Sequence, residues 1–419
     1  MNNNMKIKIA NGRLVDPKNG LDQQADLFIA DGLIAGIGQT PAGFVADHSI
    51  DAKGHIVCPG LIDLAARLKG IESELKAAVS GGVTTLVCPP DANPPLDEPE
   101  LVERLVRRAA ETALTRVLPL GALTQNLSGE RLAELVGLKR AGCIAFSQAK
   151  QPITDTQALL RALEYAATFG FAVWLQPEDY WLSRNGVAHD GKVADKRGLT
   201  GIPVAAETIA VGTLLQLARE TGVRLHLQHL SSAAGVGMVE EAQRTGLPVT
   251  CDIGVHYLHL TESDIGYFDS NARFDPPLRA DSDRTGLRAA VKRGVAAICS
   301  DHTPCDADDK ALPFAEAKPG ATGLELLLSL TLQWAEEEKI ALPAALARIT
   351  CDAAAICGSP AGQLNVGAPA DVCIFDPAVE WQVTAETLKS CGKNTPFIGK
   401  TLKGRAVTTV VGGQVVYQA

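Results

Sequence analysis

The sequence lacks several features that mark particular classes of protein. It contains no run near the roughly 18 consecutive apolar residues that a membrane-spanning helix needs. Its first residues show no basic stretch followed by an apolar one, so a signal peptide is not expected either. No block of more than three Lys or Arg residues occurs, and the net charge is −9, which argues against nucleic-acid binding.

Paired cysteines are also missing, although the chain has ten cysteines. None of them forms a C-x-x-C motif, and their spacing gives no disulfide framework. We therefore expect the cysteines to be small core residues, in a protein of the reducing cytoplasm. Those that lie within apolar segments are Cys58, Cys88, Cys143, Cys251, Cys299 and Cys373.

The sequence does contain enough apolar material for a large core. Of its 419 residues, 46% are hydrophobic and 21% are charged, which excludes a disordered chain. This length suits one large α/β barrel with an appendage, or two to three ordinary domains. Eight histidines are, as a count, enough for a metal enzyme.

The segment 1–55 alternates short apolar runs with turn signals. Apolar and polar residues follow each other with period two, which indicates strands. Asn11-Gly12 and Asp31-Gly32 are strong signals for two-residue hairpin turns. We expect a small antiparallel sheet here.

From residue 56 onwards, short apolar runs alternate with helical patterns. Seven or eight strand–helix units over roughly 300 residues fit a (β/α)8 barrel of the TIM type. A doubly wound open sheet is the alternative, but no G-x-G-x-x-G follows the first strand. We expect strands at 58–63, 83–88, 116–120, 143–146, 172–175, 224–227, 248–251 and 296–299, and helices at 98–112, 129–141, 156–169, 205–221 and 323–339.

After residue 362 the pattern of short strands and turns returns, with a hairpin signal at Gly412-Gly413. The two chain ends share this pattern, and the termini of a domain often lie close together. We therefore infer one small β-sandwich domain built from 1–55 and 362–419. It flanks the barrel, which we assign to 56–361.

Eight short strings follow one another along nearly the whole chain. They are PGLID at 59–63, GGVTT at 81–85, NPP at 93–95, GIP at 201–203, HLQH at 226–229, DPPLR at 275–279, DHTP at 301–304 and GAPAD at 367–371. Together they resemble the signature strings of the dihydroorotase family of metal-dependent amidohydrolases. That resemblance implies a (β/α)8 barrel with a β domain made from both termini.

The chain departs from this family at the first strand. After PGLID, the resemblance implies a His-x-His-x-Arg string, whose imidazoles bind zinc and whose arginine holds the substrate carboxylate. These places hold Ala65, Arg67 and Lys69. Alanine has no lone pair, and a guanidinium repels a divalent cation. Asn93 matches a substrate-binding position, so Lys69 and Asn93 are interpreted as remnants of a substrate site.

Two further ligand positions are also replaced. The fourth-strand ligand, an Asp or a carboxylated Lys in the family, is matched by Gln148, and Lys150 lies beyond the matching place. The fifth-strand histidine is replaced by Gln176, a far weaker ligand than imidazole. Only two of the family's ligand positions keep a matching residue. His229 matches the sixth-strand ligand, and Asp301 matches the eighth-strand residue that is both ligand and general base.

This count decides the chemistry expected at the barrel mouth. Catalytic zinc normally has three protein ligands, and His229 and Asp301 supply two. Without a metal, water keeps a pKa near 15.7, and no hydroxide forms at neutral pH. We therefore expect no metal, no cofactor and no catalytic residue, and an ion pair of Asp301 with Arg67. His226 and His229 are expected to point to opposite faces of their strand.

The resemblance leads to one preferred function and two alternatives. The preferred one is a non-catalytic dihydroorotase-like subunit that assembles with the catalytic chain of aspartate carbamoyltransferase in pyrimidine biosynthesis. We expect this subunit to form a homodimer or a higher oligomer. The first alternative is an active zinc-dependent cyclic amide hydrolase with an unusual site that includes His229, Asp301 and Cys305. The second is a metal-free protein that binds a small ligand through Arg67, Lys69 and Asn93.

Overall fold

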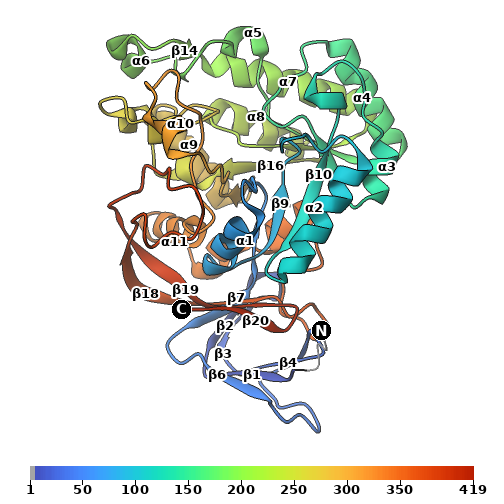
Figure 1. Ribbon diagram of the computed structural model, residues 1–419, viewed down its shortest axis with the longest axis vertical. Coiled ribbons are helices and arrows are strands. Elements are labelled where there is room, and N and C mark those ends of the chain that lie inside the picture. The colour runs from blue at the N-terminus through green and yellow to red at the C-terminus, as the bar shows by residue number, and fades with distance from the viewer. Residues whose placement is uncertain (1–4) are drawn as a thin grey trace.

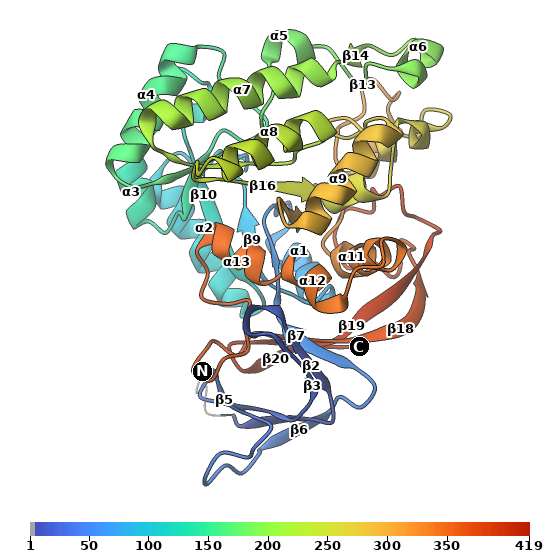
Figure 2. The same cartoon turned by 180° about the vertical axis from the view of Figure 1, so that it is seen from behind.

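The computed structural model describes residues 5–419. At its centre lies a sheet of eight strands in the order β17-β16-β15-β12-β11-β10-β9-β8 (Figure 1, Figure 2). Every neighbouring pair is parallel. The strands are β8 (Leu61–Asp63), β9 (Val83–Cys88), β10 (Arg116–Ala122), β11 (Ala145–Ser147), β12 (Ala172–Leu175), β15 (Arg224–Leu227), β16 (Val249–Gly254) and β17 (Ala297–Cys299).

Hydrogen bonds just beyond β8 and β17 join the first barrel strand to the last. The His302 amide donates to the Ala65 carbonyl at 3.0 Å, and Ala66 pairs with His302 as a parallel bridge. The fully buried Asp63 carboxylate accepts hydrogen bonds from the amide and the hydroxyl of Ser300. These contacts curl the sheet into a barrel, so the open doubly wound alternative is wrong.

Helices cover the outside of the barrel (Figure 2). The helix predicted over 129–141 begins only at Leu135, and Gly129, where it was expected to start, has a left-handed backbone (φ 77°). Within 5–419, no helix is both long and apolar enough to cross a bilayer. The helices are α1 (Ile71–Ser80), α2 (Pro99–Thr112), α3 (Leu135–Arg140), α4 (Thr156–Thr168), α5 (Tyr180–Ser183), α6 (Lys192–Arg197), α7 (Val204–Thr221), α8 (Ala233–Arg244), α9 (Asp281–Arg293), α10 (Ala307–Ala311), α11 (Leu327–Glu337), α12 (Leu342–Ala347) and α13 (Cys351–Cys357).

The two chain ends form two further sheets that share a separate apolar core (Figure 1). One has the strand order β5-β4-β1-β6 and the other β20-β19-β18-β7-β2-β3. A short pair, β13 (Ala188–His189) and β14 (Gly201–Ile202), lies apart from both. The strands are β1 (Ile7–Ala10), β2 (Arg13–Asp16), β3 (Leu21–Gln24), β4 (Leu27–Ala30), β5 (Leu33–Ile37), β6 (His48–Asp51), β7 (Ile56–Pro59), β18 (Val372–Gln382), β19 (Thr401–Val411) and β20 (Gln414–Gln418).

Two of the three predicted hairpin turns are confirmed. Asp31-Gly32 joins β4 to β5 and Gly412-Gly413 joins β19 to β20, both in antiparallel pairs. The hairpin at Asn11-Gly12 is wrong, because β1 pairs with β4 and β6 whereas β2 pairs with β3 and β7. The chain crosses between the sheets at Gly12, where a Cβ atom would lie 2.5 Å from Val57 Cγ2. The first sheet is also mixed, since β6 runs parallel to β1.

The predicted first barrel strand is divided between the two parts of the molecule. Ile56–Pro59 pairs with β2 and β18 in the β domain, and only Leu61–Asp63 pairs with β9 in the barrel. Gly60 lies between them against the side chain of Thr84, where a Cβ atom would collide. Gly60 is thus the only residue between β7 of the β domain and β8, the first strand of the barrel.

The cysteines are unpaired, and most of them lie in the core. All ten are free, and eight are buried, including the six that the apolar segments indicated. The two others are Cys351, which is half-buried, and Cys391, which is exposed. Cys391 lies in a loop, and its backbone amide donates to the Glu74 carboxylate at 3.1 Å.

The helix α1 is attached to the last barrel strand by a buried hydrogen bond. His302 Nε2 lies 2.8 Å from Glu74 Oε2, and both side chains are almost fully buried. His302 Nδ1 accepts from the Gly323 amide at 3.1 Å, which leaves Nε2 as the donor to Glu74. Burial favours the neutral carboxyl, but the hydrogen bond from His302 outweighs it and lowers the pKa of Glu74 to about 2.

We expect Glu74→Gln to lower the free energy of unfolding, and to do so less at acid pH. The folded pKa lies below the ordinary value of 4.5, so this stabilisation is present above about pH 4.5 and is lost as the pH falls towards 2. Denaturant titrations from about pH 7 to about pH 3 measure the difference. Glu72→Gln, at an exposed position of the same helix, is the control and should change little. A pH-independent difference would contradict this account.

Candidate functional site

Arg67 follows the first barrel strand and pairs with two carboxylates. Its Nε donates to Asp91 Oδ2 at 2.8 Å, and its Nη1 donates to Asp301 Oδ1 at 3.1 Å. Nη1 also donates to Thr303 Oγ1 at 3.0 Å. The side chain of Arg67 is 16% exposed and that of Asp301 is 1% exposed. The expected pair of Arg67 with Asp301 is confirmed.

His229 lies next to this pair, beyond the end of β15. Its Nε2 is 3.7 Å from Asp301 Oδ1, and its Nδ1 is 3.2 Å from Asp252 Oδ1. The prediction that His226 and His229 point to opposite faces is wrong, because His226 Nε2 also contacts Asp252, at 2.9 Å. The strand ends at Leu227, and His229 has a left-handed backbone (φ 56°), which turns its ring towards the same carboxylate.

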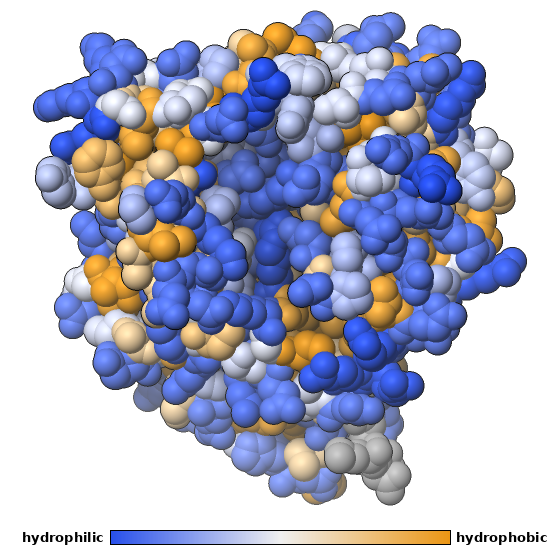
Figure 3. Space-filling model, turned by 45° about the horizontal axis from the view of Figure 1, so that its top comes forward, coloured by the Kyte–Doolittle hydropathy of each residue, from blue (hydrophilic) through white to orange (hydrophobic). Residues whose placement is uncertain are grey.

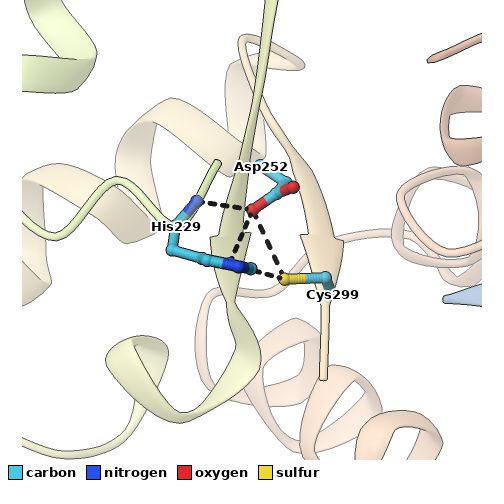
Figure 4. Close-up of side chains that lie close together, drawn as sticks. All are labelled: His229, Asp252 and Cys299. Atoms are coloured by element: carbon cyan, nitrogen blue, oxygen red, sulfur yellow. Dashed lines mark hydrogen bonds and ion pairs between the residues drawn. The ribbon is translucent and has the colours of Figure 1, made fainter. Parts of the chain in front are cut away.

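His229, Asp252 and Cys299 form a compact buried cluster (Figure 4). Asp252 Oδ1 accepts from the His229 backbone amide at 2.8 Å and from Cys299 Sγ at 3.4 Å, besides the His229 ring. Burial raises the pKa of the Cys299 thiol well above its usual range, so the thiol keeps its proton. The donor atoms of this cluster are therefore occupied by one another, and Asp252 orients the ring of His229.

The donor set at the barrel mouth does not fit a zinc ion. The Arg67 cation pairs with Asp301 Oδ1, the same oxygen that His229 Nε2 approaches, and a guanidinium repels a divalent cation. Ala65 is fully buried and offers no donor. The alternative ligand set of His229, Asp301 and Cys305 does not come together as a cluster. In residues 5–419, the only three ligand-type side chains with donor atoms within 4.8 Å of one another are His229, Asp252 and Cys299.

Lys150 reaches the centre, although its place in the sequence suggested otherwise. Its Nζ donates to the Asp275 carbonyl at 2.7 Å and lies 3.7 Å from Asp301 Oδ2. Ala149 has a left-handed backbone (φ 50°), and this bend after β11 redirects the next residue inwards. Sequence reasoning missed the inward position of Lys150 and did not identify Asp252, a lone carboxylate within the strand β16.

The two glutamines that replace family ligands lie on the opposite side of the mouth. Gln148 Oε1 accepts from Thr124 Oγ1 at 3.0 Å, and Gln176 Nε2 donates to Asp275 Oδ1 at 3.3 Å. Gln148 Nε2 and Gln176 Oε1 are buried and have no hydrogen-bond partner in the described part of the chain. Burial, and then the charge of Asp275, raise the pKa of the nearby Glu178 to about 7.

The charges at the centre compensate one another. Burial disfavours a charged Asp301, but Lys150 and His229 outweigh it and hold the pKa of Asp301 well below its usual range. Burial also disfavours charge on His229, but Asp301 and Asp252 raise its pKa above the ordinary value. Asp301 is therefore an ionised partner of neighbouring cations.

Lys69 and Asn93 are not part of this central cluster. They line a neighbouring cavity of about 740 Å³, which Arg67 and Asp91 also line. Lys69 Nζ lies 2.5 Å from Asp306 Oδ2, so its ammonium is already paired. Figure 3 shows the mouth side of the molecule with a hollow among hydrophilic residues.

Comparisons with known families match the whole barrel. The family described as dihydro-orotase-like matches residues 54–234, and the family described as amidohydrolase matches residues 192–417. A "dihydroorotase-like protein" of Pseudomonas putida is 44% identical over 99% of each chain. A protein of Citrifermentans bemidjiense named "dihydroorotase" is 40% identical over 99% of this chain and 100% of its own.

Solved structures match the fold. The L-hydantoinase (dihydropyrimidinase) of Arthrobacter aurescens superimposes with a TM-score of 0.87 at 25% identity, over 98% of this chain and 96% of that chain. A structure of D-hydantoinase gives a TM-score of 0.84 at 24% identity, over 99% and 95%. The barrel and the β domain are thus those of the amidohydrolase fold.

We expect Arg67→Met to lower the free energy of unfolding by about 3 kcal/mol, because removing one partner of a buried ion pair leaves its carboxylates uncompensated. Thermal and denaturant unfolding measure this. Arg161→Met is the control, since Arg161 pairs with Glu164 at the surface and should change stability by less than about 1 kcal/mol. Equal effects of the two substitutions would contradict a structural role for Arg67.

Proposed function

Because the chain belongs to the dihydroorotase-like family of amidohydrolases, we propose that it is a non-catalytic member and serves as an assembly subunit. The observation that carries the loss of catalysis is Arg67. Its guanidinium pairs with Asp301, the family's metal ligand and base, at 3.1 Å. The positive charge of Arg67 thus stands beside the carboxylate that binds the metal in the family.

The partner in this proposal is the catalytic chain of aspartate carbamoyltransferase, in cytoplasmic pyrimidine biosynthesis. Changes at the ligand positions leave the barrel and the β domain complete, so the outer surface is what the protein still offers to other molecules. The ten free cysteines are consistent with a reducing compartment. Self-association into a homodimer or higher oligomer forms part of the same proposal.

A second candidate is an active cyclic amide hydrolase. The observation that favours it is the relative of Citrifermentans bemidjiense, named "dihydroorotase" and 40% identical over nearly the full length. Buried, unpartnered amide atoms of Gln148 and Gln176 could also contact a polar substrate. Such an enzyme would have to work around the Arg67 ion pairs, which is why we rank it second.

We expect the purified protein to contain far less than one zinc per chain and to show no hydrolysis of dihydroorotate after incubation with zinc. Elemental analysis and an absorbance assay measure the two quantities. As the control, a triple variant (Ala65→His, Arg67→His, Gln176→His) returns three imidazoles around His229 and Asp301, and should bind zinc. Near-stoichiometric zinc in the wild type, with turnover abolished by Asp301→Ala, would overturn the proposal and support the second candidate.

We expect a stable mixed complex when the protein is combined with the aspartate carbamoyltransferase chain of the same organism. Analytical ultracentrifugation detects it as a species heavier than either component. Asp301→Asn is a matched control, because a buried central substitution should leave an assembly formed through the outer surface unchanged. Sedimentation of the two chains as separate species would refute the assembly role without bearing on the loss of catalysis.

A further inference from the structure

The cavity beside the central cluster is large enough for a small molecule. Its volume of about 740 Å³ falls within the range of ligand sites in proteins. The loops after β8, β9 and β17 form part of its wall, and one face of α2 forms another part. Leu101, Arg104, Leu105 and Arg108 of α2 line it, with the spacing of one helical face.

Arg104 and Arg108 have no partner for their charge. Neither guanidinium makes an ion pair within 4.0 Å, nor any hydrogen bond, with a residue of 5–419. They lie four residues apart, and like charges at this spacing repel each other and destabilise a helix. Both side chains are exposed and line the cavity, so their charge is open to the cavity as well as to solvent.

The other charges that line the cavity are paired. Its three carboxylates each bind one base, through the pairs Arg67–Asp91, Lys69–Asp306 and Lys318–Asp309. Five basic side chains and three acidic ones line the space, so its net charge is +2, on a chain whose net charge is −9. After the pairing, that excess lies on Arg104 and Arg108.

We propose that this cavity binds a small molecule with two negative charges, a dicarboxylate or a phosphate ester, through Arg104 and Arg108. A guanidinium presents a planar fork of donors that matches carboxylate and phosphate oxygens. The ligand would relieve the repulsion between the two arginines, and Leu101 and Leu105 would contact its apolar part. The site needs neither a metal nor hydrolysis, so it goes beyond the assembly role.

The site shares its cavity with Lys69 and Asn93, at the family's substrate positions, but it uses different anchors. Its anchors lie on α2, not at the strand ends. Lys69, which stands at the family's arginine position, has its ammonium tied to Asp306 at 2.5 Å. The two arginines are thus the groups in the cavity wall that remain available to an anion.

Calorimetric titration of the full-length protein with sodium succinate and with sodium pyrophosphate tests the site. Sodium acetate at matched ionic strength is the monoanion control. The double variant Arg104→Gln/Arg108→Gln should weaken binding of the dianion by about tenfold or more, since each charge-assisted hydrogen bond is strong. Arg107 is exposed, as Arg104 and Arg108 are, but it does not line the cavity, so Arg107→Gln removes the same charge and should leave the affinity unchanged.

Preference for succinate assigns the dicarboxylate class, and preference for pyrophosphate assigns the phosphate class. Failure of both anions to bind the wild type would overturn the proposal. So would equal binding by the wild type and the double variant, or a fall of the same size in Arg107→Gln. Circular dichroism shows whether each variant is folded. Zinc content and mixed assembly are measured separately, so this site and the assembly role fail independently.

Discussion

The ion pairs of Arg67 hold together the part of the molecule where the family performs its chemistry. Arg67 follows the first barrel strand, Asp91 follows the second and Asp301 follows the last, so one guanidinium links three strand ends. A buried cation of this kind is tolerated only because carboxylates surround it. The carboxylates that stabilise Arg67 are already paired with its charge, which does not suit the binding of a divalent ion.

The neighbouring groups extend this compensation across the barrel mouth. Asp252 contacts the ring of His229, and Lys150 approaches Asp301 from the loop after the fourth barrel strand. Closure of the barrel through Asp63 and Ser300 brings the first and last strands into contact, which makes the pairing of Arg67 with Asp301 possible. The side chains at the barrel mouth therefore form a set of mutually compensating charges in a complete fold.

Much of the architecture could be predicted from the sequence, because strand and helix periods are local. The alternation after residue 56 indicated the barrel, and the turn signals at Asp31-Gly32 and Gly412-Gly413 marked real hairpins. The turn at Asn11-Gly12 misled because it connects two sheets, and partner choice between sheets is not a local property. The replacements at Ala65 and Gln176 could likewise be read directly from the chain.

By itself, the sequence determined the residue types at each strand end, and with them the absence of three imidazoles near His229. The tertiary structure decided where the remaining side chains point. The left-handed backbones of Ala149 and His229 turn Lys150 and a histidine ring into the centre, against expectation from strand alternation. Packing also left Arg104 unpaired beside a cavity, since only the fold places a helix face against strand-end loops.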